Sequence, residues 1–288
     1  MNAIVIGMEG TETVFEDSEK TFIELSNSQR LQIINALINS KMNLTLIAKH
    51  LGITMQEAHR NFNRLMEAGI VSKDSNGAYS LTTFGNTIVT QIPSINFLSK
   101  NKAYFSDHYF ADLPMKFVQR IGSLDNSTFV QGLVAVIEEI KEMYRHSEEF
   151  IYGMIPQVPL DLMEVAAKVV KDRKISFNYI LPKNAVIPKK GIDFLNEMNF
   201  QDLLKNGLVE RKMVEEVKVS VVLNEKKALV MFPSIKGETD MNGAFLGSVN
   251  RNDDNDNINM LFHEWCLDYF RYCWLRSKPF DNTKLREV

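Results

Sequence analysis

The sequence predicts a fold of the mixed α+β or α/β class, divided between two modules. Its 288 residues exceed the size of one small domain, and 45% of them are hydrophobic, so two cores can be buried. Apolar residues recur at helical spacing from residue 28 and are followed by the turn dipeptide Asn76-Gly77. From residue 128 onward, strand-like and helix-like runs alternate, which indicates an α/β layer.

The first module opens with two short helical segments. The first helix is expected from residue 28, after a capping box of Ser26 and Gln29. Its inward residues are expected to be Leu31, Ile34, Leu37 and Ile38. The second helix covers residues 44–51 and stops at Gly52, where a left-handed residue ends a helix at low cost.

A third helix and a hairpin complete this module. The helix starts at the capping box of Thr54 and Glu57. Its inward residues are expected to be Met55, Ala58, Phe62, Leu65 and Met66. Residues 70–72 and 78–81 flank the Asn-Gly turn and read as the two strands of a wing. Residues 28–92 are therefore predicted to form a winged helix-turn-helix.

The outward face of the third helix carries side chains that can read DNA bases. These are Gln56, His59, Arg60 and Asn63, with Arg64 beside them. Asparagine and glutamine can bond adenine, arginine can bond guanine, and such a helix fits the major groove of double-stranded DNA. Lys73 in the wing, and Arg30 and Lys49 near helix starts, are expected to contact phosphates. The alternative is an ordinary solvated helix face.

Charge and apolar content restrict the class of protein. The net charge is −3, but the acidic residues concentrate in residues 1–27, an N-terminal extension, whereas residues 28–92 have a basic excess. No stretch approaches the roughly 18 apolar residues of a membrane span. The opening residues lack the basic flank of a signal peptide. We therefore expect a cytoplasmic protein with no membrane partner.

The second part of the chain reads as a helical connector, an α/β domain and a short tail. The connector, residues 93–127, is apolar and either packs on its own domain or pairs with a second copy in a homodimer. Residues 128–276 are expected to bind an effector or a protein partner, and residues 277–288 form the tail. Helices are expected over 128–146, 160–170, 192–204 and 258–274, strands over 150–155 and 175–181, and a hairpin over 217–232. The strand ends after Ile155 and Leu181 either line a pocket or form ordinary proline-containing loops.

Two stretches resemble known regulators. The stretch from Ile33 to Gly85, which ends in Leu-Thr-Thr-Phe-Gly, resembles the winged helices of archaeal ArsR-like and TrmB-like transcription regulators. Residues 110–276, with Leu113-Pro114 and the segment Trp265–Trp274, are similar to archaeal regulators that carry a methanogenesis-regulator-type middle domain. The resemblance implies promoter binding as a dimer and a sensor-like C-terminal domain.

Sequence motifs for catalysis are missing. The second module resembles the phospholipase D-like fold that serves as a sensor in the TrmB group, whose catalytic pattern is His-x-Lys. None of the five histidines is followed by lysine two residues later. Neither a phosphate-binding P-loop nor a dinucleotide fingerprint occurs. We therefore expect neither an enzyme nor a bound cofactor.

The sequence offers only poor candidates for a metal site. His263, Cys266 and Cys273 share one predicted helix and could form a small metal or redox site, but their aromatic neighbours favour a core position. The acidic stretch 250–257 lacks the glycine and distal glutamate of a calcium loop, so a solvated loop is expected there. The sequence thus predicts no bound metal.

Three functions fit these observations. The first is a sequence-specific transcription regulator whose second module binds a ligand or mediates assembly. The second is an architectural or chromatin DNA-binding protein without a small ligand. The third, an enzyme fused to a DNA-binding domain, is disfavoured because no nucleophile and base can be paired. The sequence predicts the first.

Overall fold

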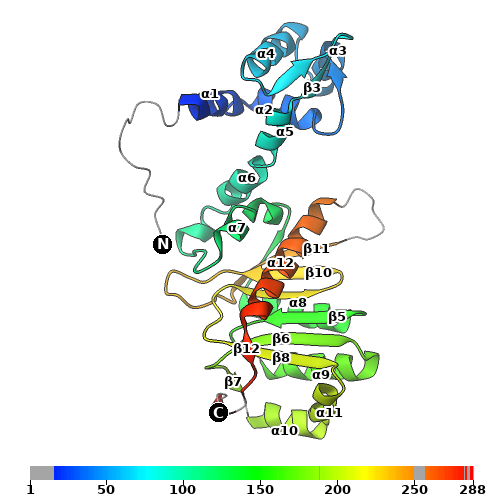
Figure 1. Ribbon diagram of the computed structural model, residues 1–288, viewed down its shortest axis with the longest axis vertical. Helices are drawn as coiled ribbons and strands as arrows, with labels where there is room; N and C mark the ends of the chain where they lie inside the picture. The colour runs from blue at the N-terminus through cyan, green and yellow to red at the C-terminus, as the bar shows by residue number, and fades with distance from the viewer. Residues whose placement is uncertain are drawn as a thin grey trace. The chain divides into compact units, whose positions relative to one another are not determined.

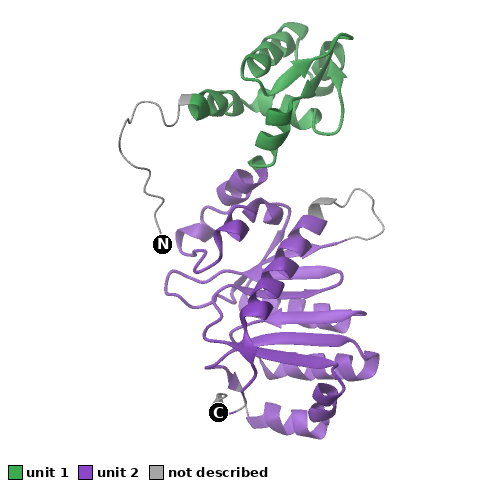
Figure 2. Ribbon diagram, in the orientation of Figure 1, with its two compact units in different colours: residues 1–92 green, residues 93–288 purple. Residues whose placement is uncertain are grey.

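The computed structural model describes residues 16–157, 159–187, 189–249, 257–281, 283 and 286–287 (Figure 1). The chain forms two compact units, residues 1–92 and residues 93–288 (Figure 2). The first unit has one buried core. The second has two, one on each face of a large sheet. The acidic stretch predicted as a solvated loop falls almost entirely outside the described residues.

The first unit has the winged helix-turn-helix arrangement that the sequence predicts. Its described elements are α1 (Glu16–Leu25), α2 (Ser28–Ala36), β1 (Met42–Asn43), α3 (Leu44–Leu51), α4 (Met55–Glu67), β2 (Val71–Lys73), β3 (Ala78–Leu81) and α5 (Thr83–Val89). The strands form an antiparallel sheet in the order β1-β3-β2, in which the β2-β3 hairpin is the wing. The helix-turn-helix consists of α3 and α4. The helix α1 is additional to the prediction.

Local sequence signals set most helix ends in this unit. Gly52 closes α3 in the left-handed conformation, with φ at 65°. Thr54 and Glu57 form the capping box predicted for α4. The cap of α2 differs from the prediction: Asn27, rather than Ser26, accepts a backbone N–H of the first turn. Asparagine one residue later is an equally good cap, so the sequence alone did not separate the two.

The core of the first unit centres on a stacked aromatic pair. Phe62 of α4 and Tyr79 of β3 lie with ring centroids 3.8 Å apart, and both are buried. Ile38 and Met55 were expected to face inward but are 43% and 46% exposed. Ile38 follows the last turn of α2 and Met55 is the first residue of α4, so neither lies on the buried stripe of its helix.

The second unit is built on an eight-stranded mixed sheet. Its strands are β4 (Thr128–Gln131), β5 (Phe150–Met154), β6 (Ser176–Pro182), β8 (Val209–Val214), β9 (Ser220–Asn224), β10 (Lys227–Met231), β11 (Gly243–Ser248) and β12 (Lys278–Pro279). The order is β12-β8-β6-β5-β9-β10-β11-β4. The pairs β5-β6 and β6-β8 are parallel, and the other pairs in the sheet are antiparallel. A separate parallel pair joins β7 (Val186–Ile187) to β13 (Arg286–Glu287).

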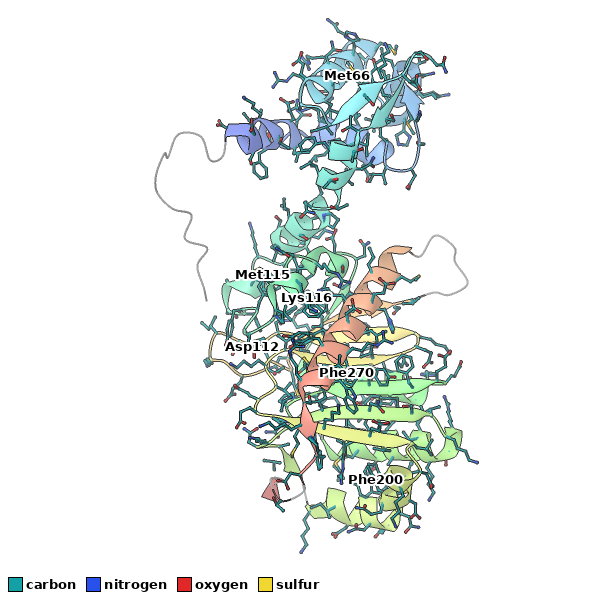
Figure 3. All side chains as sticks on the ribbon, viewed as in Figure 1. Met66, Asp112, Met115, Lys116, Phe200 and Phe270 are labelled. Carbon is teal, nitrogen blue, oxygen red and sulfur yellow. The ribbon has the colours of Figure 1, made fainter. Side chains whose placement is uncertain are left out.

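Helices cover both faces of this sheet. One face carries α6 (Ile92–Lys100), α7 (Met115–Val118), the 3-10 turns Tyr104–Ser106 and Ile121–Leu124, and the long α12 (Asn257–Arg276). The other carries α8 (Leu133–Arg145), α9 (Leu160–Arg173), α10 (Lys189–Glu197) and α11 (Phe200–Lys205). Figure 3 labels Phe270 of α12 and Phe200 of α11, which belong to the cores on opposite faces.

The segment expected as a connector is part of the second unit. Phe97, Phe117 and Leu124 are buried in the same core as Trp265 of α12. The indole N–H of Trp265 also donates to the Phe117 carbonyl at 3.0 Å. Six described strands of this unit are additional to the prediction: β4, β7, β8, β11, β12 and β13. The strand β4 occupies the start of the helix expected from residue 128. The hairpin of β9 and β10 and the helix α12 agree with the prediction.

Candidate nucleic-acid interface

The helix α4 presents the predicted base-reading residues on one accessible face. Gln56, His59 and Arg60 are exposed, and Asn63 is half-buried. Residues three and four positions apart lie on the same face of a helix, so these side chains form one polar surface. Met55, which was expected in the core, is also exposed at the start of this surface. Its i, i+4 spacing to His59 is the signal that could have identified it.

Two reciprocal hydrogen bonds fix the first turn of α4. The backbone N–H of Thr54 donates to Glu57 Oε2 at 2.8 Å, and the backbone N–H of Glu57 donates to Thr54 Oγ1 at 3.2 Å. The bond from the Thr54 backbone is the main reason that the pKa of the Glu57 carboxyl lies below its usual value. This turn carries Gln56, and it is the N-terminal part of such a helix that contacts bases.

The side chains on this face have few partners inside the protein. Within the described part of the chain, Arg60 makes neither a hydrogen bond nor an ion pair. Asn63 Nδ2 lies 3.4 Å from His59 Nδ1, a contact between two accessible side chains of one helix. Their hydrogen-bonding groups are therefore available to an external partner.

Arg30 and Arg64, both predicted to contact DNA, each pair with a buried carboxylate. Glu24 of α1 is 6% exposed and pairs with Arg30 at 3.0 Å and with Arg64. Arg30 also donates to the Ile23 and Glu24 carbonyls, which are free at the end of α1. The hydrogen bond to Glu24 raises the pKa of Arg64. Sequence reasoning missed Glu24 because this pairing spans 40 residues.

The wing is held by an aspartate at its turn. Asp74 Oδ1 accepts the backbone N–H groups of Asn76 and Ala78, both at 3.0 Å, and the bond from Ala78 is the main reason that the pKa of Asp74 is lowered. Gly77 adopts φ of 80°, as the Asn-Gly turn requires. Lys73 is exposed, with its ammonium 5.3 Å from the centroid of the Tyr79 ring. The wing thus presents one cation on a rigid hairpin.

The remaining predicted contact, Lys49, was expected near a helix start but lies in the last turn of α3. Its side chain is exposed. Asn61, which lies between Arg60 and Asn63 in the sequence, is buried and donates to Gln29 Oε1 at 2.9 Å. This bond ties α4 to α2 and explains why a polar residue occupies the inner face of α4.

Two cavities lined by described residues of the second unit lie on opposite faces of its sheet. One, of about 380 Å³, lies beyond the carboxyl ends of β5 and β8, between Asp112 (Figure 3) and Arg276. The other, of about 70 Å³, is lined by α9 and the middle of β5, β6 and β8. Ile155 and Leu181, at the strand ends singled out in the sequence, both line the smaller cavity.

The cysteines and histidine of α12 are packed in the core or against the sheet. Cys266 is buried, and burial raises the pKa of its thiol. Cys273 lies beside the Tyr269 hydroxyl, and burial raises its pKa to about 11. His263 Nε2 lies 2.6 Å from the Asn224 carbonyl oxygen. Among the described residues, no three His, Cys, Asp or Glu side chains are grouped as metal ligands.

The described helices include none that is both long enough and apolar enough to cross a membrane.

No protein-family model matches the sequence, and no curated protein matches it.

Solved structures with a similar arrangement include DNA-binding proteins. TrmBL2, an archaeal chromatin protein, is 12% identical over 92% of this chain and 100% of its own, with a TM-score of 0.37. A homodimeric winged helix-turn-helix domain from Mycobacterium bovis, Mb0332, is 18% identical over 33% of this chain and 90% of its own, with a TM-score of 0.28. Nuc from Salmonella typhimurium, a phospholipase D family member, is 10% identical over 55% of this chain and 100% of its own, with a TM-score of 0.37.

Proposed function

We propose that this protein is a transcription regulator that binds double-stranded promoter DNA through its first unit, with α4 in the major groove. The observation that carries the proposal is the α4 face of Gln56, His59, Arg60 and Asn63, which is accessible and poor in internal partners. An ordinary solvated helix face does not require so many side chains that can bond base edges. Here they gather near the first turn of α4, the second helix of the helix-turn-helix.

The proposed contacts divide into two kinds. Arg60 and Asn63 bond base edges and give sequence preference. Lys73 of the wing and Lys49 of α3 bond phosphates and position the protein on the duplex. Arg30 is left out, because its guanidinium is 12% exposed and already bonded. Arg64 serves chiefly to anchor α1, and its half-exposed edge adds positive charge beside the groove.

The second unit supplies regulation or assembly in this proposal. The helix α6 buries Phe97 in its own unit but leaves Ile95 and Leu98 exposed by 55% and 37%. A second copy of the chain would cover this apolar stripe, and a dimer would match a DNA site with two-fold symmetry. The cavities described above would accommodate an effector.

The test is fluorescence anisotropy of the full chain on DNA from its own promoter and on shuffled DNA, across a range of salt concentrations. We expect at least about a tenfold preference for the promoter and an affinity that falls as salt rises. Arg60→Ala and Asn63→Ala should each cost about 1 to 3 kcal/mol on the promoter and less on shuffled DNA. Lys73→Ala should weaken binding to both DNAs alike.

Arg145→Ala is the matched control, because it removes an exposed arginine of α8 that pairs only with Glu142 in the described structure. It should leave DNA binding unchanged. Equal losses at Arg60 on both DNAs would reassign that residue to a phosphate contact. Equal, weak binding of the wild type to both DNAs would reject sequence-specific regulation in favour of an architectural role.

A further inference from the structure

The smaller cavity of the second unit is an apolar slot with polar groups at its two ends. It lies between the sheet and α9, and its volume is about 70 Å³. Small side chains leave this space open: Gly153 on the sheet side, and Ala166 and Ala167 on α9. Phe177 and Phe200 add aromatic surface to its walls. Such a slot suits a flat, apolar molecule.

Strand register places three lining residues in a row across the floor of the slot. Gly153 of β5 pairs with Tyr179 of β6, and Tyr179 pairs with Arg211 of β8. Residues paired in register point to the same face of a sheet, and adjacent strands lie about 4.8 Å apart, so the row spans about 10 Å. One end of the slot is therefore a glycine and the other an arginine.

A hydroxyl without a hydrogen-bond partner among the described residues lies at the glycine end. Tyr144 of α8 is 3% exposed and lines the cavity. Its hydroxyl lies 3.7 Å from the position that a Cβ on Gly153 would occupy. Among the described residues, no group forms a hydrogen bond with this hydroxyl. The hydroxyl can therefore donate a hydrogen bond to a ligand atom or a bound water.

A guanidinium without a counter-ion lies at the other end. Arg211 is half-buried, and no carboxylate of the described chain lies within ion-pair distance of it. Its guanidinium packs on the Phe280 ring at 4.1 Å, and Arg211 lies beside Tyr179, its register partner on β6. These contacts hold the group in place and leave it charged. A half-buried arginine that is fixed but unpaired favours an anionic ligand group, and a planar carboxylate fits it best.

We propose that this cavity binds a small aromatic carboxylate, with its acid group on Arg211 and a polar substituent at the far end on Tyr144. The enclosed volume of about 70 Å³ equals that of several water-sized spheres, so the slot encloses part of the ring, and the remaining atoms lie toward its open edge. The carboxylate then lies at the half-buried edge formed by Tyr179 and Arg211. A para-hydroxylated ring acid has its two polar groups at opposite ends, as the slot does.

This inference names the effector class of the proposed regulator, but the binding itself does not depend on DNA. It is therefore measured on the full chain without DNA. The probes are 4-hydroxybenzoate, benzoate and phenol. Their binding is measured by calorimetry and by the rise in the thermal unfolding temperature of the second unit. Trp265 and Trp274 both belong to α12, so tryptophan fluorescence reports the unfolding of this unit.

Wild-type protein should bind 4-hydroxybenzoate most tightly, benzoate more weakly, and phenol at least about tenfold more weakly than the hydroxy acid, because phenol lacks the charged group. Arg211→Gln should weaken both acids by about tenfold or more and leave phenol unaffected. Tyr144→Phe should weaken 4-hydroxybenzoate by about three- to tenfold and benzoate by less than about twofold.

Gly153→Ala supplies a variant that should fold normally, because the added methyl meets the Tyr144 hydroxyl at an ordinary contact distance. It should weaken both acids by filling the slot. Arg145→Gln, which makes the same charge change on an exposed face of α8, should leave binding unchanged. Failure of both acids to bind the wild type at millimolar concentration overturns the proposal, as does binding that Arg211→Gln and Gly153→Ala both leave intact. Neither result bears on DNA binding by α4.

Discussion

The carboxylate of Glu24 joins three parts of the first unit: the end of α1, the first turn of α2 and the last turn of α4. Arg30 is the more buried of its two partners, with 12% of its side chain exposed, against 49% for Arg64. A buried ion pair adds little net stability, but removing one partner leaves the other charge buried and uncompensated. The loss of unfolding free energy when Glu24 is removed therefore depends mainly on Arg30.

Replacing Glu24 with alanine should lower the free energy of unfolding of the first unit by about 3 kcal/mol, because it leaves Arg30 buried without a counter-ion. Urea unfolding of the full chain, followed by far-UV circular dichroism, measures this change. Arg64→Ala is the control and should cost less, since half of that side chain already faces water. A Glu24→Ala protein as stable as the wild type would show that Arg30 is adequately solvated.

The residues of the candidate interface could be predicted only where their partners are close in sequence. The spacing of Gln56, His59 and Arg60 along one helix placed them correctly on an exposed face. The role of Arg30 could not be predicted, because charge and position alone do not reveal a buried carboxylate. The row of Gly153, Tyr179 and Arg211 was equally out of reach, since it depends on the order in which three separate strands pair.

At the scale of elements, α5 starts where two backbone segments touch. A Cβ added at Gly85 would lie 2.1 Å from the backbone oxygen of Ile70. Thr82 holds this contact: its hydroxyl donates to the Gly69 carbonyl at 2.6 Å and accepts the N–H of Gly85 at 2.9 Å. The Leu-Thr-Thr-Phe-Gly segment that resembles known regulators therefore ends at a position that only glycine fits.

Gly85→Ala should destabilise the first unit by at least about 3 kcal/mol, because the methyl group collides with backbone that cannot rotate away. Thermal unfolding by circular dichroism should show the transition of this unit at a lower temperature. Thr87→Ala, a change at an exposed position of the same helix, should shift it by little. An unchanged unfolding temperature in Gly85→Ala would mean that α5 can move away from Ile70 without loss of stability.

The helix α12 protects its two thiols. Burial raises the pKa of Cys273 from 9.0 to about 11, which lowers the thiolate fraction at pH 8 about 100-fold. Alkylation by iodoacetamide at pH 8 should therefore be about 100-fold slower at Cys273 than at a free thiol, as mass spectrometry of timed samples would show. A rate equal to that of glutathione would contradict the burial. Urea should abolish the protection.

The raised pKa of Cys273 also determines how the stability of the second unit changes with pH. The folded state favours the neutral thiol, so the stabilisation is complete below the ordinary pKa near 9 and is lost as the pH rises through about 11. Cys273→Ser should reduce this alkaline loss, measured as the tryptophan-detected unfolding midpoint between pH 8 and pH 11.

Among the elements, those with local start or stop signals were predicted and those without were not. Gly52, the Thr54 capping box and the Asn76-Gly77 turn each act within a few residues, and the structure has each of them. The strand β4 lies at the edge of its sheet and runs into α8 after one residue, so its apolar residues fitted a helical period. Its partner strand, β11, lies more than 100 residues later in the sequence.

At the scale of the whole molecule, the two units have separate cores and should unfold separately. Phe62→Ala removes a ring from the core of the first unit and should cost that unit about 3 to 5 kcal/mol. Circular dichroism should then show an earlier transition, while tryptophan fluorescence, which reports α12, should keep its wild-type midpoint. A shift of equal size in both signals would mean that the units unfold as one.

The position of α12 in the chain has a consequence for protein synthesis. This helix supplies Phe262, Trp265 and Phe270 to one core of the second unit, yet it ends at Arg276, 187 residues after the last residue of α5. At about 5 to 20 residues per second, a ribosome needs roughly 10 to 40 s to cover that distance. The first unit can fold during this interval, whereas the face of the large sheet that α12 covers lacks this helix until residue 276 has been synthesised.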